Sequence, residues 1–394
     1  MAVYLDNSAT TKPCREAVEA VNYMMTENFG NPSSLHTPGI EAAKSLISAR
    51  EAIARALGCE KDEIYFTSGA TEANNLALFG AAAAKRRAGN RIVTTAIEHE
   101  SVVAAADELE KQGFEVTLLD VHADGLVSAQ QVADAIRDDT CLVTIMFANN
   151  EIGTIQPIEA IGAVCHERGV LFHTDAVQAA GHVKIDVNAM HIDLLSLSAH
   201  KFHGPKGVGM LYARRGIILT NLIEGGAQER GKRGGTENVP GIAAMAAALT
   251  EACANMDENT KKVTALRDKL IDGISKIPHC ALNGAWEPRL PGNVNFCFEG
   301  IEGESLLLLL DAKGISASSG SACTSGSLDP SHVLLAIGRP HEVAHGSLRL
   351  TICEDNTEEE IDYILAELPP IVDDLRNMSP VWKDLMSGKR QFTL

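Results

Sequence analysis

Two polar segments stand where short apolar runs of the sequence end, and both could bind a ligand. The segment 68–72, Ser-Gly-Ala-Thr-Glu, follows one run and opens a helical stretch. Its backbone N–H groups and positive helix end would attract an anion such as a phosphate, although a plain Thr helix cap explains the pattern equally well. Asp175 follows a second run. Its carboxylate would face the ligand crevice of a parallel sheet, although a helix cap is by itself the commoner role.

Lys201 stands directly after a third apolar run, in the segment Ser-Ala-His-Lys-Phe-His-Gly-Pro-Lys-Gly at 198–207. A lysine held in a partly desolvated site has a lowered pKa and can form a Schiff base, whereas a loop lysine is ordinarily exposed. Here the anion site, the acidic strand end and the lysine follow successive apolar runs, which favours the chemical interpretation. Pyridoxal phosphate needs these three partners: a cradle for its phosphate, a carboxylate on its ring nitrogen and a lysine on its aldehyde.

The elements that must position these residues alternate between residues 64 and 213. We expect strands at 64–67, 92–95, 115–119, 142–147, 170–174, 194–198 and 208–212, and helices near 72–88, 101–112, 128–138 and 158–168. Several strands are continuous apolar runs, as doubly covered parallel strands are. The alternation predicts an α/β fold with a mostly parallel sheet. The short connection after Ser198 carries Gly204, Pro205 and Gly207, and it predicts that the last two strands form an antiparallel edge.

The regular alternation of strands and helices ends after residue 213. A Gly-rich, charged loop at 225–241 precedes a helical stretch at 242–277 that breaks near 257–259. A strand at 293–298, a helix at 304–313, a Ser/Gly loop at 316–331, a strand at 347–352 and a final helix follow, and Thr357 with Glu360 predicts a capping box at the start of that helix. We expect a large domain over 15–259 and a smaller α+β domain built from 1–14 and 260–394.

Composition narrows the class of protein. The chain has 394 residues with 45% hydrophobic and 22% charged residues, which are globular values. Asp+Glu number 52 against 34 Lys+Arg, so the formal net charge is -18 and we expect neither a nucleic acid nor a membrane as partner. No stretch approaches the roughly 20 apolar residues of a membrane helix, and the N-terminus does not resemble a signal peptide. We therefore expect a cytoplasmic protein.

The nine cysteines form no C-x-x-C pair, so we expect neither a disulfide framework nor a structural zinc site. Most of them have apolar neighbours and are expected to be small buried hydrophobes. Cys323 differs, because it stands in Ser-Ser-Gly-Ser-Ala-Cys-Thr-Ser-Gly-Ser at 318–327, where almost no side chain can pack. We expect this segment to be mobile and its thiol to be accessible.

Taken together, these motifs resemble the cysteine desulfurases of the NifS/IscS kind, within the class V aminotransferases of fold-type I pyridoxal-phosphate enzymes. The resemblance runs from Tyr4 to the final helix, and the segments at 328–332 and 344–349 look closer to the NifS branch. It rests on Tyr-Leu-Asp-Asn-Ser-Ala-Thr-Thr at 4–11, Phe-Gly-Asn-Pro-Ser-Ser-Leu-His at 29–36, Glu98-His99, Ala-Asn-Asn-Glu-Ile-Gly at 148–153, His-Thr-Asp-Ala-Val-Gln at 173–178, the Lys201 segment and Gly-Ala-Gln-Glu-Arg-Gly at 226–231.

The resemblance implies a role for each cofactor-binding residue. Lys201 would hold pyridoxal phosphate as an internal aldimine, and Asp175 would keep the ring nitrogen protonated. Gln178 would bond the ring hydroxyl, and His99 would stack on the ring and help with proton transfers. The phosphate would be bound by Thr71, Ser198, His200 and, from the neighbouring subunit, Thr236. Ala70 and Asn150 would also be cofactor-binding residues. A homodimer is therefore implied.

The resemblance also implies the chemistry. Asn150 and Arg349 would hold the substrate L-cysteine, although spacing alone leaves a surface arginine open for Arg349. Cys323 would accept the sulfur as a persulfide while L-alanine forms, and an iron–sulfur scaffold protein would take the sulfur next. The Ser-Ser-Gly-Ser-Ala-Cys-Thr-Ser sequence matches the long-loop subgroup. No metal is required, although Cys323 could ligate an iron–sulfur cluster transiently.

Other functions stay open at this point. A selenocysteine lyase or a class V transaminase would share the cofactor site, but neither needs a persulfide-forming cysteine on such a loop. A dinucleotide-dependent dehydrogenase is disfavoured, because no G-x-G-x-x-G opens the first βα unit. A non-catalytic sulfur carrier would leave Lys201 and Asp175 without a purpose. The sequence does not decide between nitrogenase maturation and general cluster assembly.

Overall fold

A computed structural model of the chain describes residues 2–319 and 329–394. Its largest element is a seven-stranded sheet in the order β2-β8-β7-β6-β5-β3-β4. The strands are β2 (Ile64–Thr67), β3 (Arg91–Thr95), β4 (Glu115–Leu119), β5 (Thr140–Thr144), β6 (Leu171–Asp175), β7 (Leu194–Ser198) and β8 (Gly209–Ala213). The expected α/β class with a mostly parallel sheet is confirmed, and the expected strands at 64–67, 115–119 and 194–198 have the observed bounds.

The antiparallel part of the sheet differs from expectation. β7 and β8 are antiparallel, as predicted, but β8 is not at the edge, because β2 pairs antiparallel with its other side. The sequence did not predict this strand order, because β2 lies more than 140 residues before β8 and no local sequence pattern indicates that they pair. Its consequence is that β2 runs parallel to β7, so both strands end at the same side of the sheet as β6.

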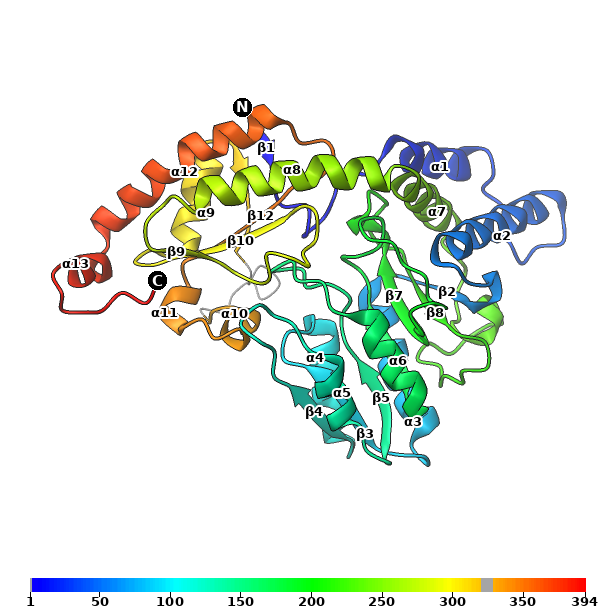
Figure 1. Ribbon diagram of the computed structural model, residues 1–394. Coiled ribbons are helices and arrows are strands. Elements are labelled where there is room, and N and C mark those ends of the chain that lie inside the picture. Colours follow the sequence, from blue (N-terminus) through cyan, green and yellow to red (C-terminus); the bar gives the residue numbers. More distant parts are fainter. Residues whose placement is uncertain (1, 320–328) are drawn as a thin grey trace.

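Helices cover both faces of this sheet (Figure 1). One face packs on α3 (Ala70–Lys85) and α4 (Glu100–Lys111), through strand residues such as Leu142, Leu194 and Leu211. The neighbouring strand residues, such as Val143 and Leu195, point to the other core, because successive side chains of a strand alternate between faces. That core is closed by α1 (Arg15–Thr26), α2 (Thr37–Leu57), α5 (Ala129–Ala135), α6 (Ile158–Arg168) and α7 (Val239–Ala254).

A separate core gathers the two ends of the chain. Val3 and Leu5 pack there with residues from Val263 to Val372. Its strands are β1 (Val3–Tyr4), β9 (Cys280–Leu282), β10 (Asn293–Phe298), β11 (Ile315–Ser316) and β12 (Ser347–Thr351), and its helices are α8 (Met256–Ile274), α9 (Gly303–Ala312) and α12 (Glu358–Met378). The remaining helices are α10 (His332–Ala336), α11 (His341–Ala344) and α13 (Pro380–Met386), and α10 and α11 pack with Ile97 and Met146 in another cluster. β1 lies parallel to β11 and β12 pairs with β10, so the N-terminal segment crosses this unit on its way to the large sheet.

The helical stretch after residue 239 is divided as expected, but at Asn255, and the two helices α7 and α8 meet at 72°. α7 is mostly apolar and lies buried against α1 and α2. No single helix of the described residues is long and apolar enough to cross a membrane, and only the bent pair α7–α8 meets that length and composition together. The predicted capping box of Thr357 and Glu360 is present at the start of α12.

Candidate functional site

The turn from β2 into α3 leaves a helix N-terminus open beside the end of β7. Gly69 is the N-cap of α3, and without a side chain it cannot bond the first N–H groups of the helix. A Cβ on Gly69 would lie 3.9 Å from the Ser198 hydroxyl, and one on Gly209 would lie 2.7 Å from the Gly69 backbone. Glycine at 209 therefore lets this turn sit against β8, where N–H groups and a hydroxyl can meet an anion.

An ion pair fixes the same turn from outside. Glu72 accepts hydrogen bonds from the backbone and hydroxyl of Ser68 at 2.9 and 2.6 Å, and it pairs with Arg233 at 3.0 Å. Burial would raise the pKa of the Glu72 carboxyl, but the bonds from Arg233 and Ser68 outweigh burial and lower it. The turn is thereby tied to the 225–238 loop, on which Thr236 is exposed near Ser68.

Asp175 is buried and is the last residue of β6, whereas the sequence predicted that it follows the strand. Its carboxylate accepts a bond from Asn74 Nδ2 at 2.7 Å and one from the Val177 backbone N–H at 3.0 Å. Asn74 Nδ2 also reaches the Ser101 hydroxyl at 2.9 Å, which lies 2.8 Å from His99 Nδ1. The Asn74 amide therefore links Asp175, through Ser101, to His99.

The tautomer of His99 follows from its hydrogen bonds. His99 is the N-cap of α4, and its Nδ1 accepts the Ser101 backbone N–H at 3.1 Å. In the neutral ring the proton is therefore on Nε2. The preceding Glu98 is fully buried, and burial raises the pKa of its carboxyl to about 8. It is bonded by the Thr95 hydroxyl at 2.7 Å and the Met146 N–H at 3.0 Å.

The N-terminal segment gathers the remaining cofactor-site residues. Lys201 Nζ donates to the carbonyl oxygens of Ser8 and Ala9 at 2.5 and 2.8 Å, and Gln178 Nε2 donates to the same Ser8 oxygen at 3.0 Å. The adjacent His200 imidazole is neutral at neutral pH, because burial and then the charge of Lys201 lower its pKa to about 4. Lys201 and Gln178, from different strand ends, thus meet at one carbonyl.

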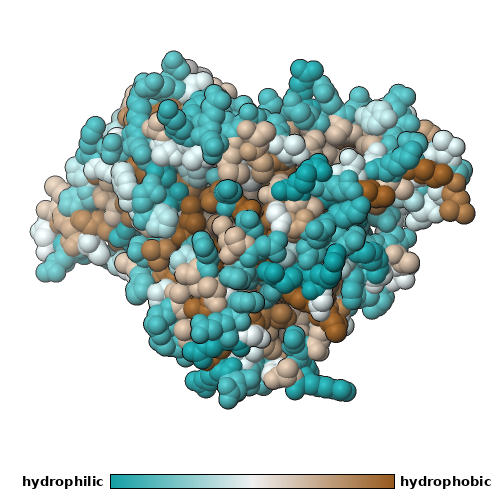
Figure 2. Space-filling view, turned by 45° about the vertical axis from the view of Figure 1, so that its right-hand side comes forward, coloured by the Kyte–Doolittle hydropathy of each residue, from teal (hydrophilic) through white to brown (hydrophobic). Residues whose placement is uncertain are grey.

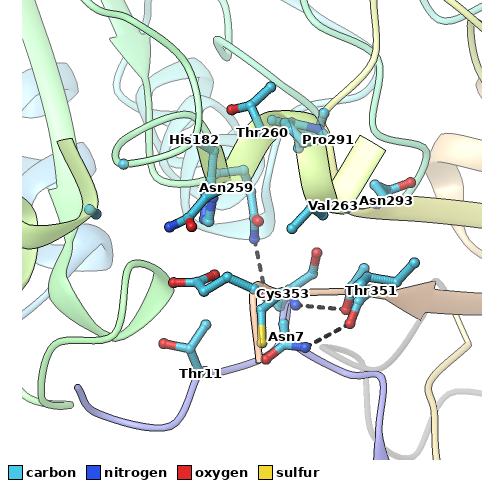
Figure 3. Close-up of a pocket in the computed structure, with 18 of the residues that line it drawn as sticks. Asn7, Thr11, His182, Asn259, Thr260, Val263, Pro291, Asn293, Thr351 and Cys353 are labelled. Atoms are coloured by element: carbon cyan, nitrogen blue, oxygen red, sulfur yellow. Dashed lines mark hydrogen bonds between the residues drawn. The ribbon is translucent and has the colours of Figure 1, made fainter. Parts of the chain in front are cut away.

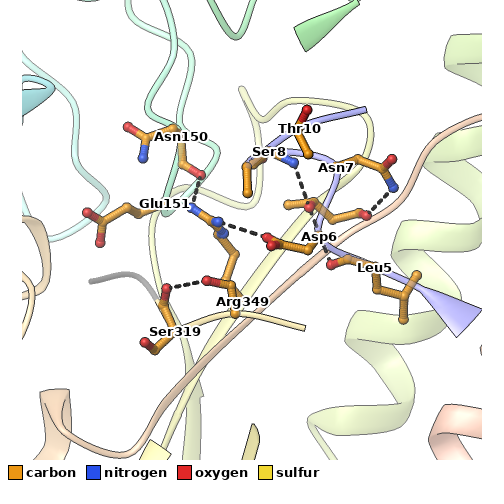
Figure 4. A network of polar contacts seen from close by, with 12 residues as sticks. Leu5, Asp6, Asn7, Ser8, Thr10, Asn150, Glu151, Ser319 and Arg349 are labelled. Atoms are coloured by element: carbon orange, nitrogen blue, oxygen red, sulfur yellow. Dashed lines mark hydrogen bonds and ion pairs between the residues drawn. The ribbon is translucent and has the colours of Figure 1, made fainter. Parts of the chain in front are cut away.

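Arg349 is buried, so the surface arginine that the sequence left open is excluded. It pairs with Asp6 at 3.0 Å and donates to the Asn150 carbonyl at 3.3 Å (Figure 4). Its buried Nε–H has no hydrogen-bond partner among the described residues. Arg349 and Asn150 are therefore neighbours, as the substrate-binding prediction requires, and one guanidinium donor is still available for a carboxylate.

The structure thus brings most of the predicted site residues together. Asn74 joins α3 to Asp175, Gly69 lies beside Ser198, and Gln178 lies beside Lys201. The predicted nucleophile, Cys323, lies outside the described residues. Asn74 was not among the predicted site residues, although an amide on the otherwise apolar, buried face of α3 was a visible signal.

These residues fit pyridoxal phosphate. An uncapped helix end can take the phosphate, a buried carboxylate held by two donors can stay ionised beside a ring nitrogen, and a lysine amine stands at the end of the adjacent strand. His99, whose neutral ring carries its proton on Nε2, completes a set that can bind and reprotonate an amino acid.

The chain is similar to known proteins over most of its length. Residues 3–364 match the model of the family "Aminotransferase class-V". A cysteine desulfurase IscS of Clostridium botulinum is 55% identical over 392 residues, 99% of each chain, and one of Methanosarcina thermophila is 56% identical over 96% of this chain and 94% of its own. Among solved structures, a "NifS-like protein" is 39% identical with a TM-score of 0.90 over 95% of this chain and 100% of its own. "SspA in complex with cysteine" is 38% identical with a TM-score of 0.80, over 89% and 99%.

Proteins described as IscS and as NifS-like are therefore both similar to this sequence over at least 95% of the chain. The chain belongs to the class V aminotransferases and, within them, to the pyridoxal-phosphate-dependent cysteine desulfurases.

Proposed function

We propose that this cysteine desulfurase converts L-cysteine to L-alanine with Cys323 as the sulfur acceptor. The observation that carries the proposal is the convergence of Asp175, held by Asn74, with Lys201, held at Ser8, and with an uncapped helix end. A bound cysteine complex is the subject of the SspA structure. In the overall reaction, L-cysteine and the Cys323 thiol give L-alanine and a Cys323 persulfide, so atoms and electrons balance without another reagent.

The chain's own residues divide the work. Pyridoxal phosphate, when bound, withdraws electrons from the substrate's Cα and lowers the barrier to loss of its proton. Lys201 and His99 Nε2–H are the groups that move that proton, and the ionised Asp175 keeps the ring nitrogen protonated. Arg349 Nε–H is directed at the substrate carboxylate. The Cys323 thiolate attacks the substrate sulfur, and the carbon–sulfur bond breaks.

The decisive experiment measures alanine and sulfide released from L-cysteine, with dithiothreitol as the reductant that frees sulfide. Cys323→Ser should keep its cofactor and still bind cysteine, but it should release neither product. The matched variant Cys280→Ser, on strand β9, should behave as the wild type. Sulfide release by Cys323→Ser at the wild-type rate would overturn the assignment. Selenocysteine cleavage that continues in this variant would locate the loss at the cysteine-specific step.

We also propose the larger setting of the reaction. The enzyme passes its persulfide sulfur to an iron–sulfur scaffold protein, acts in the cytoplasm and works as a homodimer. Exposed apolar side chains of the α1–α2 region support the dimer. The two cores support a large domain at 15–259 and a small one from 1–14 and 260–394. Thr236 would then reach the phosphate bound by the neighbouring subunit.

A further inference from the structure

A hollow lies beside the cofactor-site residues Ser8 and Gln178, between α7 and the small core. It is bordered by Ala252 of α7 and by Val263 and Ile352 of the small core, and it contains about 660 Å³ of space free of atoms, part of it open to solvent. Figure 3 shows Cys353 near its centre, with Thr11 on one side and His182 on the other. Its wall combines apolar and polar side chains, and the polar groups considered next have no part in the reaction described above.

Three potential metal ligands meet in this hollow. The Nε2 atom of His203, the sulfur of Cys353 and a carboxylate oxygen of Glu354 lie within 4.8 Å of one another. His203 Nε2 is 3.3 Å from Glu354 Oε1. Two nitrogen or oxygen ligands of a tetrahedral Zn²⁺ ion are about 3.3–3.5 Å apart when each is 2.0–2.2 Å from the metal. The spacing of this pair is that of two zinc ligands.

The orientation of His203 is already fixed. Its Nδ1 lies 2.8 Å from the Lys12 carbonyl oxygen, which can only accept, so Nδ1 carries the proton. A neutral ring then presents the lone pair of Nε2 to the hollow. Histidines that bind metals are oriented in the same way, by donating their other N–H to a carbonyl or carboxylate.

The same side chain is under two constraints. His203 has φ 63°, a left-handed conformation that a non-glycine residue adopts at a cost. Its Nε2 is buried and has no hydrogen bond of acceptable geometry among the described residues. The backbone of His203 is held by Thr11, which bonds its N–H at 2.8 Å, and by Cys14, whose N–H reaches its carbonyl at 2.8 Å. A strained residue is thus held with an unsatisfied nitrogen directed at a carboxylate.

We propose that His203, Cys353 and Glu354 form a binding site for Zn²⁺, with water from the hollow as the fourth ligand. The imidazole, thiolate and carboxylate are all ligands that zinc accepts. A neutral imidazole, one thiolate and one carboxylate also balance the two positive charges of the ion. Zinc takes the place of the thiol proton of Cys353, so the bond to sulfur forms as one proton is released to solvent.

The site would join parts of the chain that are far apart in sequence. His203 follows Lys201 by two residues, whereas Cys353 and Glu354 follow β12, the strand that carries Arg349. The cysteine pattern of the sequence could not reveal this set, because a search for C-x-x-C finds only ligands that are close in the chain.

The competing explanation is a simple ion pair. Burial lowers the pKa of His203, but the Glu354 carboxylate outweighs burial and raises it, and His203 holds the pKa of Glu354 at about 2. A protonated His203 would then satisfy Glu354 without a metal. In that case Cys353 would have no part in the contact, since burial and the nearby Glu354 charge raise its thiol pKa to about 12. The role of Cys353 therefore separates the two explanations.

The test uses the pyridoxal-phosphate-loaded enzyme with Cys323→Ser, so that the catalytic thiol cannot bind metal. After treatment with a chelator and desalting, the protein is titrated with Co²⁺, a coloured substitute for zinc, and then with Zn²⁺ against a chromophoric chelator. We expect one ion per chain, visible Co²⁺ bands of a tetrahedral site at longer wavelength than the cofactor, and displacement of Co²⁺ by Zn²⁺. Far-ultraviolet circular dichroism and cofactor content check the folding of each variant.

Two variants and their matched controls decide the outcome. Cys353→Ser should lose the cobalt–thiolate charge-transfer band and bind Zn²⁺ at least about 100-fold more weakly, and Glu354→Gln should bind it at least about 10-fold more weakly. Cys280→Ser and Asp355→Asn, an exposed neighbour, should bind as the parent does. Less than one ion per two chains in the parent overturns the proposal. Equal binding by the parent and a well-folded Cys353→Ser overturns it as well.

Discussion

At the scale of single residues, the active site depends on side chains that touch no reacting atom. Asn74 donates to both Asp175 and Ser101, and Ser101 contacts His99. A hydrogen bond to a charged group stabilises by about 1.5–3 kcal/mol. Asn74 is thus a positioning residue, because it holds the carboxylate that must stay ionised beside the ring nitrogen.

Asn74→Ala should therefore lower kcat/KM for L-cysteine by about 10- to 100-fold, the kinetic equivalent of one lost bond to a charged group. The cofactor should still bind, but the pH dependence of its absorbance should shift, because the carboxylate that pairs with the ring nitrogen loses one of its two donors. Asn75→Ala is the matched control, since Asn75 bonds only the Thr71 carbonyl of its own helix. An unshifted absorbance profile in Asn74→Ala would contradict the positioning role.

Glu98 allows a prediction about stability and pH. Its pKa is about 8 in the folded protein and 4.5 in the unfolded chain, because burial disfavours the charged form. The contribution of Glu98 is fully present below pH 4.5 and is lost as pH rises through 8. Between these values the free energy of unfolding falls by up to about 1.4 kcal/mol per pH unit through this group alone.

Glu98→Gln removes that ionisation. The midpoint of thermal unfolding of the variant, measured from pH 5 to pH 8, should therefore rise relative to that of the wild type as pH increases. Glu100 is the first residue of α4, and its side chain is partly exposed. Glu100→Gln should therefore leave the difference in midpoint from the wild type independent of pH. Parallel curves for Glu98→Gln and the wild type would show that Glu98 ionises normally.

At the scale of elements, the phosphate cradle depends on how closely β8 approaches the β2–α3 turn. A Cβ on Gly209 would lie 2.5 Å from the Leu197 carbonyl oxygen and 2.7 Å from the Gly69 Cα, and both are backbone atoms. Gly209→Ala should displace the turn, destabilise the protein by about 1–3 kcal/mol and weaken cofactor binding.

Cofactor content after dialysis and the midpoint of thermal unfolding measure both effects. Gly388→Ala is a suitable control, because Gly388 has φ 75° and nothing within 4 Å of the added methyl. It should cost stability through the backbone alone and retain the cofactor. If Gly209→Ala retained its cofactor like Gly388→Ala, the cradle would not depend on the close approach.

The elements were predictable where one local pattern decides them. The bounds of α6 at Ile158–Arg168 and of β10 at Asn293–Phe298 follow from apolar runs and flanking turn residues. The interior place of β8 was not predictable, because it depends on pairing with the distant β2. The candidate site was predictable at Asp175, which ends β6, and at Lys201, three residues after β7. It was not predictable at Ser8, whose carbonyl gains its role only when the N-terminal segment folds against the large sheet.

At the scale of the whole molecule, the α1–α2 region presents apolar side chains that the described chain does not cover. Leu35 is 95% and Phe29 73% exposed, and Tyr23, Met25, Ile40 and Ile47 are exposed as well. Figure 2 shows hydrophobic side chains at the right of the molecule, on the side where α2 lies in Figure 1. Exposed apolar groups gathered in this way mark an interaction surface, and a second copy of the chain is the partner proposed above.

Introducing charge on this surface should therefore separate the subunits. The wild type should sediment at twice 42.0 kDa, whereas Phe29→Glu with Leu35→Glu should sediment at 42.0 kDa, because two carboxylates per subunit would be buried against apolar groups. The separated chains should also lose cofactor about 10-fold more readily, since Thr236 could no longer reach the neighbour's phosphate. Leu308→Glu, on the exposed face of α9, is the matched control and should stay dimeric. A wild type that sediments as a single chain would overturn both the dimer and the role of Thr236.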